Sequence, residues 1–417
     1  MKKVCLIHPP HLNASDDRLD PPMGLLYIAA YLKKHNVDVS VVDLSGTTVF
    51  DMPFADVYGI TVYISSLQVT KDIIIKCKEV NPKSKIVVGG AHPSACPCSF
   101  EEVDYVVVGY GEVAMLDIVT EKVKSKVVVG LEPENQFSFP SYDLVNLSSY
   151  SRKIEGKPSV TYTTSRGCPF QCHFCGLAKM HELGFGVRMA EPEIVYSHLK
   201  RLKEEFGIER INFQDDIFTF NQKRLFRMLE LIKLLGIKFR CMGRAGYDTK
   251  EVYKRLADAG CVQVAYGIES GSQYILDRMK KQVTVEDNYN VIRWAKECKI
   301  VSRAFFMIGF PGETEKTIEE TKQFIINADP DQIFVSNFIP YPGTKIGDCP
   351  EKFGIIKVYK DYDQYYQVCK DGTGGVVIDT KWLSKEEFKV LELEFRDWIN
   401  KRPMRGPLQD YEMRKLK

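Results

Sequence analysis

Residues 160–175 read Val-Thr-Tyr-Thr-Thr-Ser-Arg-Gly-Cys-Pro-Phe-Gln-Cys-His-Phe-Cys. The first five residues of this stretch are β-branched or aromatic, a composition that predicts a buried strand. The chain then turns at Gly167 and carries Cys168, Cys172 and Cys175 on the loop that follows. In sheets of parallel strands, ligands bind at the carboxyl ends of the strands. We therefore expect the three cysteines to lie at a ligand site.

Strand-like and helix-like segments alternate on the C-terminal side of this stretch. Five more strands are predicted at residues 210–213, 238–242, 262–267, 302–308 and 332–339. Helices are predicted between them, at residues 192–206, 222–235, 250–259, 285–298 and 315–328. Six consecutive β/α units predict a partial (β/α)6 barrel over residues 155–345, with its chemistry at the carboxyl ends of the strands.

The same alternation precedes the cysteine loop, over residues 1–145. Strands are predicted at residues 4–7, 37–44, 56–62, 85–88 and 105–108, and helices at 24–32 and 69–80. Continuous β-branched runs are typical of parallel strands covered on both faces, so we expect a doubly wound, Rossmann-like domain. No Gly-x-Gly-x-x-Gly follows the first strand, which disfavours a nicotinamide site. Residues 346–417 are expected to form a small, mostly helical cap.

The composition is that of an ordinary globular protein. Hydrophobic residues make up 44% and charged residues 27% of the 417 residues, and the formal net charge of +2 argues against a polyanion-binding surface over the whole chain. No apolar run approaches the roughly 18 residues that span a bilayer, and the N-terminal apolar stretch is too short for a signal peptide. We expect a cytoplasmic protein. The basic tail from Lys401 is interpreted as a solvated helix end, so no nucleic-acid partner is expected.

The three clustered cysteines predict a metal centre. Soft thiolates bind iron–sulfur clusters or zinc. Structural zinc needs four protein ligands, and only His173 or His181 could supply the fourth here. Three cysteines without an obvious fourth ligand favour a [4Fe–4S] cluster with one open iron, while zinc and a chance grouping stay open as alternatives. The other nine cysteines are scattered and are interpreted as small core residues rather than as a disulfide framework.

The spacing Cys168-x-x-x-Cys172-x-x-Cys175 resembles the signature of the radical S-adenosylmethionine (SAM) enzymes. The resemblance covers residues 155–345. It implies that the cluster binds SAM at its open iron, that reduction by an external donor such as flavodoxin or ferredoxin yields a 5′-deoxyadenosyl radical, and that the strand ends hold SAM. The residues implied as SAM contacts are Phe174, Gln214, Asp215, Asp216, Arg244, Glu269, Ser270, Ile308 and Gly309. Taken singly, the Asp215-Asp216 pair would also suit a helix cap, and Arg244 a surface ion pair.

The N-terminal domain resembles the cobalamin-binding domain that precedes many radical SAM enzymes. The resemblance rests on residues 21–32, 89–94 and 109–112. It implies cobalamin contacts at Met23, Gly24, Thr61, Tyr63, Ser65, Gly89, Gly90, His92, Gly109, Gly111 and Glu112. Two departures stand out: the motif Asp-x-His-x-x-Gly is absent, and residues 44–56 are too few for the usual crossover helix. Tyr63 is the candidate for the lower face of the corrin, and His92 for the cobalamin tail.

The two resemblances together imply a cobalamin-dependent radical SAM methyltransferase that acts on an unactivated carbon of a small molecule, lipid or peptide. No catalytic side chain is specified, and Tyr341 and Tyr266 are named only from their strand-end positions. The alternatives are a non-methylating cyclase or rearrangement enzyme, a methylthiotransferase and a cluster-bearing electron-transfer protein. An auxiliary cluster on Cys349 and Cys369 is a further alternative, and Tyr359, Tyr362, Tyr365 and Tyr366 are expected to line a pocket or to pack the cap.

Overall fold

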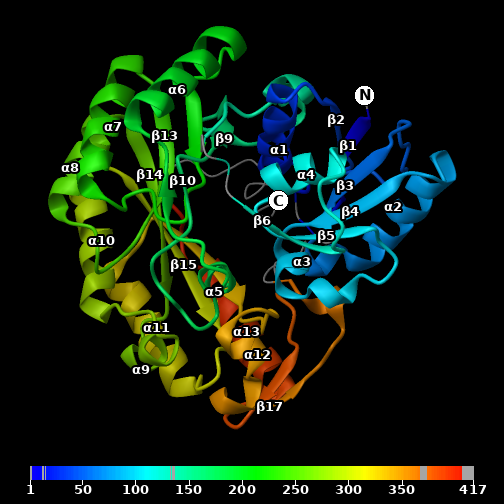
Figure 1. The fold of residues 1–417 in the computed structure, drawn as a ribbon. Helices are drawn as coiled ribbons and strands as arrows, with labels where there is room; N and C mark the ends of the chain where they lie inside the picture. Colours follow the sequence, from blue (N-terminus) through cyan, green and yellow to red (C-terminus); the bar gives the residue numbers. More distant parts are fainter. Residues whose placement is uncertain are drawn as a thin grey trace. The chain divides into compact units, whose positions relative to one another are not determined.

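A computed structural model of the protein describes residues 2–11, 14, 16–131, 133, 137–366 and 373–405. The chain forms two compact units, residues 1–151 with 179–184, and residues 152–178 with 185–417. In Figure 1 the first unit runs mainly from blue to cyan and the second from green to red. Residues after 346 belong to the same unit as the barrel, and Cys369 lies outside the described residues.

The first unit is built on a six-stranded parallel sheet with the order β2-β1-β3-β4-β5-β6. Its strands are β1 (Lys3–His8), β2 (Asp38–Asp43), β3 (Val57–Thr61), β4 (Lys85–Gly89), β5 (Tyr105–Gly109) and β6 (Val127–Gly130). Its helices are α1 (Met23–Lys34), α2 (Leu67–Val80), α3 (Ala91–Ala95) and α4 (Gly111–Val119). The predicted Rossmann-like architecture is confirmed; the edge strand β6 was missed, although its Val-Val-Val run is typical of a strand.

Alternating side chains of these strands enter two separate cores. Cys5 and Ile7 of β1 pack with residues of α2 on one face, while Val4 and Leu6 pack with α1 and α4 on the other. Both faces are therefore buried, which explains the continuous apolar runs of the strands.

The connection between β2 and β3, residues 44–56, contains no helix. Its own apolar side chains, Leu44, Met52 and Ala55, enter the same core as α2. The hydroxyl of Tyr58 donates to the carbonyl of Pro53 over 2.7 Å and accepts from the backbone N–H of Ala55 over 3.2 Å. The extended connection thus covers the sheet face that a crossover helix would otherwise cover.

The second unit is built on another six-stranded parallel sheet, with the order β16-β15-β14-β13-β12-β9. Its strands are β9 (Val160–Tyr162), β12 (Arg210–Phe213), β13 (Lys238–Gly243), β14 (Cys261–Glu269), β15 (Val301–Ile308) and β16 (Gln332–Asn337). Its helices are α6 (Pro192–Phe206), α7 (Gln222–Leu235), α8 (Lys250–Asp258), α9 (Gln273–Arg278), α10 (Val285–Glu297) and α11 (Glu315–Ala328). The strands follow chain order across the sheet with helices along its outer side, as the predicted partial barrel requires (Figure 1).

Both units also contain short elements. Two-residue strands form the pairs β7 (Lys153–Ile154) with β8 (Lys157–Pro158) and β10 (Ser165–Arg166) with β11 (Arg188–Met189). The short helices are α5 (Leu177–Glu182) and α12 (Lys345–Asp348). Single 3₁₀ turns lie at Ile64–Ser66, Pro97–Ser99, Tyr142–Leu144, Leu147–Ser149, Pro350–Phe353 and Tyr362–Gln364.

The C-terminal part adds an antiparallel pair, β17 (Ile355–Val358) with β18 (Ile378–Thr380), and the helix α13 (Lys385–Asn400). Ser384 and Glu387 form a capping box that starts α13. Further along the helix, Arg396 donates to the carbonyl of Val335 over 3.1 Å and to Oδ1 of Asn337 over 2.9 Å. Since β16 is the edge strand of the sheet, these bonds cover an edge at which no further strand pairs.

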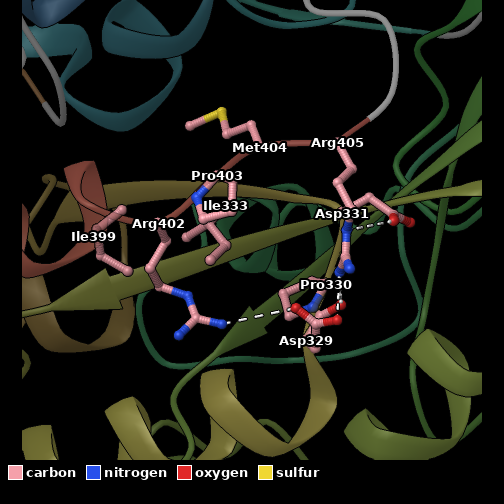
Figure 2. Close-up of a pocket in the computed structure, with 9 residues that line it drawn as sticks. All are labelled: Asp329, Pro330, Asp331, Ile333, Ile399, Arg402, Pro403, Met404 and Arg405. Carbon is pink, nitrogen blue, oxygen red and sulfur yellow. Dashed lines mark hydrogen bonds and ion pairs between the residues drawn. The ribbon is translucent and has the colours of Figure 1, made fainter.

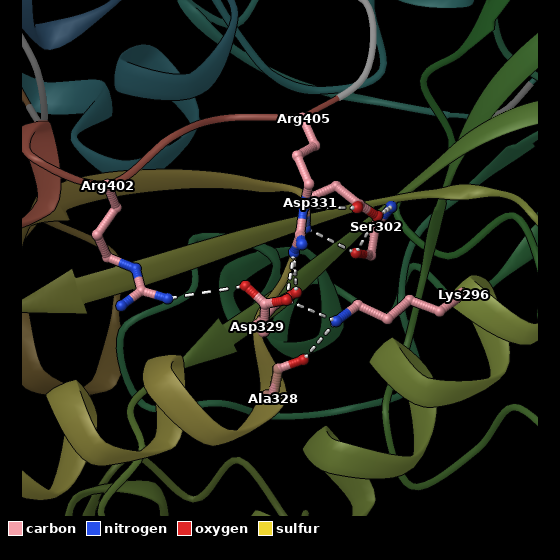
Figure 3. A network of polar contacts seen from close by, with 7 residues as sticks. All are labelled: Lys296, Ser302, Ala328, Asp329, Asp331, Arg402 and Arg405. Carbon is pink, nitrogen blue, oxygen red and sulfur yellow. Dashed lines mark hydrogen bonds and ion pairs between the residues drawn. The ribbon is translucent and has the colours of Figure 1, made fainter.

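Residues after α13 bind the amino end of the barrel, at the edge opposite to the cysteine loop. Arg402 and Arg405 both lie within ion-pair distance of Asp329, and the N–H of Arg405 donates to the carbonyl of Asp331 over 2.8 Å (Figure 3). These contacts enclose a small pocket of about 60 Å³ beside Pro330 (Figure 2). The pocket lies before β16, so it is separate from the predicted cofactor sites at the carboxyl ends. None of the helices in the described parts of the chain has the length and apolarity needed to cross a membrane.

Candidate functional site

Asp215, which follows β12, fastens the loop that carries the three cysteines. Its carboxylate accepts hydrogen bonds from the N–H of Thr164 at 2.7 Å, from Oγ1 of Thr164 at 2.5 Å and from Oγ of Ser165 at 2.6 Å. Burial raises the pKa of Asp215 to about 6, against the opposing effect of these donors. The residue is only 1% exposed. In this structure the carboxylate of Asp215 therefore holds the cysteine loop, and its contact with SAM stays a prediction.

The next carboxylate, Asp216, is exposed and accepts from the N–H of Gly167 over 2.8 Å. Gly167 has φ +90, and a Cβ there would lie 2.9 Å from the carbonyl oxygen of Gly186. Glycine is thus required where the chain turns into the cysteine loop. Gln214 is exposed at the same strand end and accepts from Nδ2 of Asn212 over 3.3 Å, so both predicted side chains remain open to a ligand.

The structure brings the three cysteines together. Cys172 is buried, Cys168 and Cys175 are partly buried, and all three are free thiols. Burial, with smaller contributions from Cys172 and Cys168, raises the pKa of Cys175 to about 12. The three sulfurs therefore lie within electrostatic reach of one another. An iron–sulfur cluster neutralises such thiolates by ligation. The chemistry of this donor set therefore fits a cluster.

The zinc alternative receives no support from the geometry. Among the described residues, no three side chains of His, Cys, Asp or Glu converge as they would around one metal ion. His173 instead ties the loop to its surroundings: its N–H donates to the carbonyl of Met279 over 2.9 Å, and its Nδ1 lies 3.1 Å from the carbonyl of Arg278. A four-iron cluster meets each thiolate at a different iron, so it needs no such convergence.

A buried group of charges and rings adjoins the cysteine loop. The guanidinium of Arg244 stacks on the ring of Phe170, 3.6 Å from its centroid, and donates to the carbonyl of Lys281. Nζ of Lys281 lies 2.8 Å from Oε1 of Glu269 and 5.9 Å from the ring centroid of Phe174. Two cations from different loops thus gather beside the cysteines. Cations of this kind suit the carboxylate of an amino acid.

Glu269 is held in an uncommon backbone conformation, with φ +65 at the end of β14. The pairing of β14 with β15 shifts register between Gly267 and Glu269, which marks a β-bulge. Bulges at strand ends re-aim side chains next to active sites. Ser270 is different: it is 1% exposed and its hydroxyl lies 3.2 Å from that of Thr321 in α11. Ser270 thus packs against α11 in this structure, and its role as a SAM contact stays a prediction.

Ile308 and Gly309 end β15. Ile308 is 1% exposed, so its side chain belongs to the core and only its backbone faces the strand end. Gly309 has φ +79, its N–H donates to Oε2 of Glu313 over 3.1 Å, and a Cβ there would lie 2.5 Å from the ring of Phe388 in α13. The turn is thus shaped by Glu313 and covered by the C-terminal helix.

The two tyrosines named as catalytic guesses lie in different surroundings. Tyr266 is 1% exposed and packs on Tyr253, with its hydroxyl 3.2 Å from Oδ2 of Asp248. Tyr266 is thus buried between strand and helix, and its catalytic role stays a prediction. Tyr341 is partly buried and its ring lies against that of Tyr365, which also contacts Tyr362. These cap tyrosines pack on one another.

The predicted cobalamin residues gather at the carboxyl edge of the first sheet. A Cβ on Gly90, which has φ +105, would lie 2.9 Å from Oγ1 of Thr61, and one on Gly111 would lie 2.5 Å from Ile28. The N–H of Gly109 donates to Oγ of Ser94 over 3.0 Å. Close backbone packing of this kind lets the strand ends approach a large ligand. The remaining predicted residues lie at the same edge: Met23, Gly24, Tyr63, Ser65, Gly89, His92 and Glu112.

The side chains of His92 and Glu112 are 6% and 5% exposed. His92 packs edge-on against Phe100, and burial lowers its pKa. The backbone N–H of His92 donates to the carbonyl of Val62 over 3.2 Å, which links the loops after β3 and β4. In this structure His92 is therefore a buried packing residue that joins the two loops at the carboxyl edge of the sheet.

Three rings that sequence reasoning did not combine meet at this edge. His8 ends β1, His11 follows it and Tyr63 follows β3; the centroids are 5.5 Å apart for His8 and His11, 4.9 Å for His11 and Tyr63, and 6.3 Å for His8 and Tyr63. Burial lowers the pKa of both histidines, although the nearby carboxylate of Asp43 opposes the effect.

Lys281 and Phe170, beside the cysteine loop, were not predicted from the sequence either. The available signals were the His-Pro-Pro-His sequence after the first strand and the Lys280-Lys281 pair after α9.

Comparisons with known proteins agree with this arrangement of two sites. Residues 162–325 match the family model described as the radical SAM superfamily, and residues 19–119 match the B12 binding domain. An uncharacterized methyltransferase of Pyrococcus horikoshii is 30% identical over 390 residues, 82% of each chain. The anaerobic magnesium-protoporphyrin IX monomethyl ester cyclase of Cereibacter sphaeroides is 24% identical over 408 residues, 87% of this chain and 65% of the relative.

The fold is also that of a solved structure. The radical SAM methyltransferase TsrM from Kitasatospora setae, with cobalamin and a [4Fe–4S] cluster bound, superposes with a TM-score of 0.71 at 16% identity and covers 98% of this chain and 92% of its own. The strand-end cysteines, the glycine-shaped edge of the first sheet and these matches lead to one assignment. The chain belongs to the radical SAM enzymes with a cobalamin-binding domain, and its cofactors are a [4Fe–4S] cluster, SAM and cobalamin.

Proposed function

We propose that this protein is a cobalamin-dependent radical methyltransferase that acts on an unactivated carbon. The observation that carries the proposal is the joining, in one chain, of a cobalamin-binding sheet to a barrel with the three-cysteine loop. When bound, the cluster and SAM supply a 5′-deoxyadenosyl radical, and cobalamin supplies the methyl group. The name of the Pyrococcus relative, which matches over 82% of this chain, supports methyl transfer.

The chain's own residues then have binding and positioning roles. Cys168, Cys172 and Cys175 hold the cluster, and Asp215 keeps their loop in place through Thr164 and Ser165. We assign the methionyl carboxylate of SAM to the cations Arg244 and Lys281, since both lie beside the cysteine loop and are stacked or placed near its phenylalanines. We assign the methionyl amino group and the ribose of SAM to three further side chains: the exposed Gln214 and Asp216, and Glu269 at the end of β14.

The proposed substrate is a small molecule, lipid or peptide with an unactivated carbon. The electron that starts the reaction comes from an external donor such as flavodoxin or ferredoxin. We place the enzyme in the cytoplasm because the cysteines of the described residues are all free thiols, which a reducing compartment preserves.

A second candidate is a non-methylating radical enzyme that closes or rearranges a ring. The 24% identity to the magnesium-protoporphyrin IX monomethyl ester cyclase supports this alternative. The two reactions differ in what becomes of SAM. A methyltransferase consumes SAM in two ways, giving S-adenosylhomocysteine as well as 5′-deoxyadenosine, whereas a cyclase gives 5′-deoxyadenosine without S-adenosylhomocysteine.

The test begins with metal content. The protein would be prepared without oxygen and supplied with iron, sulfide and hydroxocobalamin, and about four irons and stoichiometric cobalt per chain are expected. Reduced enzyme with SAM should then form both nucleoside products. Two results would favour the non-methylating alternative. One is iron without cobalt; the other is 5′-deoxyadenosine without S-adenosylhomocysteine from the cobalt-loaded enzyme.

A further inference from the structure

The rings of His8, His11 and Tyr63, which we call the ring cluster, lie where the connectivity of the first sheet reverses. Strand β1 pairs with β2 on one side and with β3 on the other, so the chain leaves β1 and β3 in opposite directions. Such a switch point is the standard ligand position of a doubly wound sheet. The ring cluster thus lies at the centre of the cobalamin edge.

His8 carries an unsatisfied polar atom. The residue is 9% exposed, and within the described residues its Nδ1 is buried without a hydrogen-bond partner. An unsatisfied buried polar group costs about 1–3 kcal/mol, so native proteins retain one mainly where it serves a ligand or a function. Phenylalanine would fill the same space without this cost. The cluster therefore has chemical requirements beyond packing.

His11 is the more accessible of the two imidazoles. Its backbone is fixed on both sides: the N–H donates to Oδ1 of Asp17 over 2.9 Å, and the carbonyl accepts from the N–H of Ala14 over 2.9 Å. Its ring lies tilted on that of Tyr63, which is 38% exposed. A partly buried imidazole on a fixed backbone is a suitable ligand for a metal that arrives with its own cofactor.

The surroundings argue against an independent metal site. Among the described residues, no third side chain of a ligand type joins the two histidines in a single-ion geometry. A corrin ring, in contrast, already fills the equatorial positions of its cobalt and needs only one donor from the protein. The ring cluster offers such a donor, even though the chain lacks the Asp-x-His-x-x-Gly motif.

We propose that His11 is the lower axial ligand of cobalt when cobalamin binds, that His8 is a positioning residue behind it, and that Tyr63 packs against the coordinated ring. The proposal rests on cobalamin binding and is independent of methyl transfer. A nitrogen ligand below the cobalt stabilises its higher oxidation states. The chain would in this way control the redox state of its cofactor.

The test uses electron paramagnetic resonance of the full-length protein loaded with cobalamin and reduced to cob(II)alamin. A lower nitrogen ligand splits each cobalt line into a triplet. Growth on histidine labelled with the heavy nitrogen isotope should convert the triplets into doublets, which separates a protein imidazole from the cofactor's own base. His11→Ala should abolish the splitting while cobalamin remains bound, and Tyr63→Phe should retain it.

His8→Ala should weaken or broaden the splitting, and His8→Gln should restore part of it, since Gln keeps a polar partner in place. Two results would overturn the proposal: a spectrum of the unaltered protein that does not respond to labelled histidine, or a splitting that survives in His11→Ala. Loss of the splitting only in His8→Ala would assign the ligand to His8 instead and refute the role of His11. Since cobalamin retention is measured in each sample, failure here is distinguishable from failure of methyl transfer.

Discussion

Nζ of Lys281 lies 2.8 Å from Oε1 of Glu269, and the two side chains are only 9% and 11% exposed. The ion pair joins the end of β14 to the segment after α9, beside the loop that carries the cysteines. A buried pair adds little net stability, but loss of one partner leaves an uncompensated charge. A substitution in this pair should therefore change both the predicted SAM site and the stability of the barrel.

Replacing Glu269 with Gln should lower the free energy of unfolding by about 3 kcal/mol, because Lys281 then remains buried without its carboxylate. Denaturant unfolding would measure the change. The double variant Glu269→Gln with Lys281→Met should recover most of the loss. SAM affinity should fall in Glu269→Gln with the cluster intact; unchanged affinity would reduce Glu269 to a structural residue.

Cys172→Ala should abolish the brown chromophore and all reductive cleavage of SAM, since Cys172 is the buried thiol between the other two in the sequence. Cys298→Ala is the matched control, because Cys298 follows α10 away from the loop and should keep full iron content. Cleavage of SAM by Cys172→Ala would rule out the cluster assignment.

Asp215→Ala should lower iron incorporation and stability together. The change leaves the N–H and the hydroxyl of Thr164 and the hydroxyl of Ser165 without their acceptor, which costs about 3 kcal/mol or more. The matched control Asp216→Ala loses one backbone hydrogen bond and should cost about 1 kcal/mol. If both variants retained equal iron per chain and equal stability, the fastening role of Asp215 would be wrong.

Glu313 should make stability depend on pH. Burial raises its pKa from 4.5 to about 7, so the charged form is disfavoured in the folded state. Because the folded pKa lies above the unfolded value, the contribution of Glu313 is full below about pH 4.5 and is lost as the pH rises to about 7.

Glu313→Gln removes this titration and can still bond to Gly309 and Thr317. We expect it to match the unaltered protein near about pH 4 and to exceed its unfolding free energy by about 3 kcal/mol at about pH 8. Unfolding followed at both pH values would measure the difference, and a pH-independent gap between the two proteins would contradict the assignment.

The amino end of the barrel should respond unequally to two substitutions. Arg405→Ala removes an exposed ion pair with Asp329 and should cost less than about 1 kcal/mol, with the loss disappearing in high salt. Asp331→Ala should cost about 2 kcal/mol at any salt, because Oδ2 accepts from both the N–H and the hydroxyl of Ser302 (Figure 3). Equal, salt-sensitive losses would mean that the ion pair dominates this end.

Most of the fold was predictable because its signals are local. Short β-branched runs separated by amphipathic segments specify parallel strands and helices, and the order of strands then follows from right-handed crossovers. Of the strands in the two large sheets, only the edge strand β6 was missed; the two-residue strands, the β17–β18 pair and short helices such as α4 and α9 were not predicted either. The connection over residues 44–56 was predicted to lack a helix, but its use of Leu44, Met52 and Ala55 to cover the sheet required the structure.

The sequence by itself determined the cofactor chemistry, since three cysteines within eight residues supply the thiolate ligands of an iron–sulfur cluster. Tertiary structure alone decided which neighbouring side chains serve that chemistry. It engaged the side-chain oxygens of Asp215 and Ser270 in hydrogen bonds inside the protein, and it buried Tyr266 against Tyr253. It also placed His11 at Tyr63, because the adjacent parallel strands β1 and β3 end at one edge, and it returned Lys281 to Glu269 after the helix α9. Spacing along the chain does not reveal either contact.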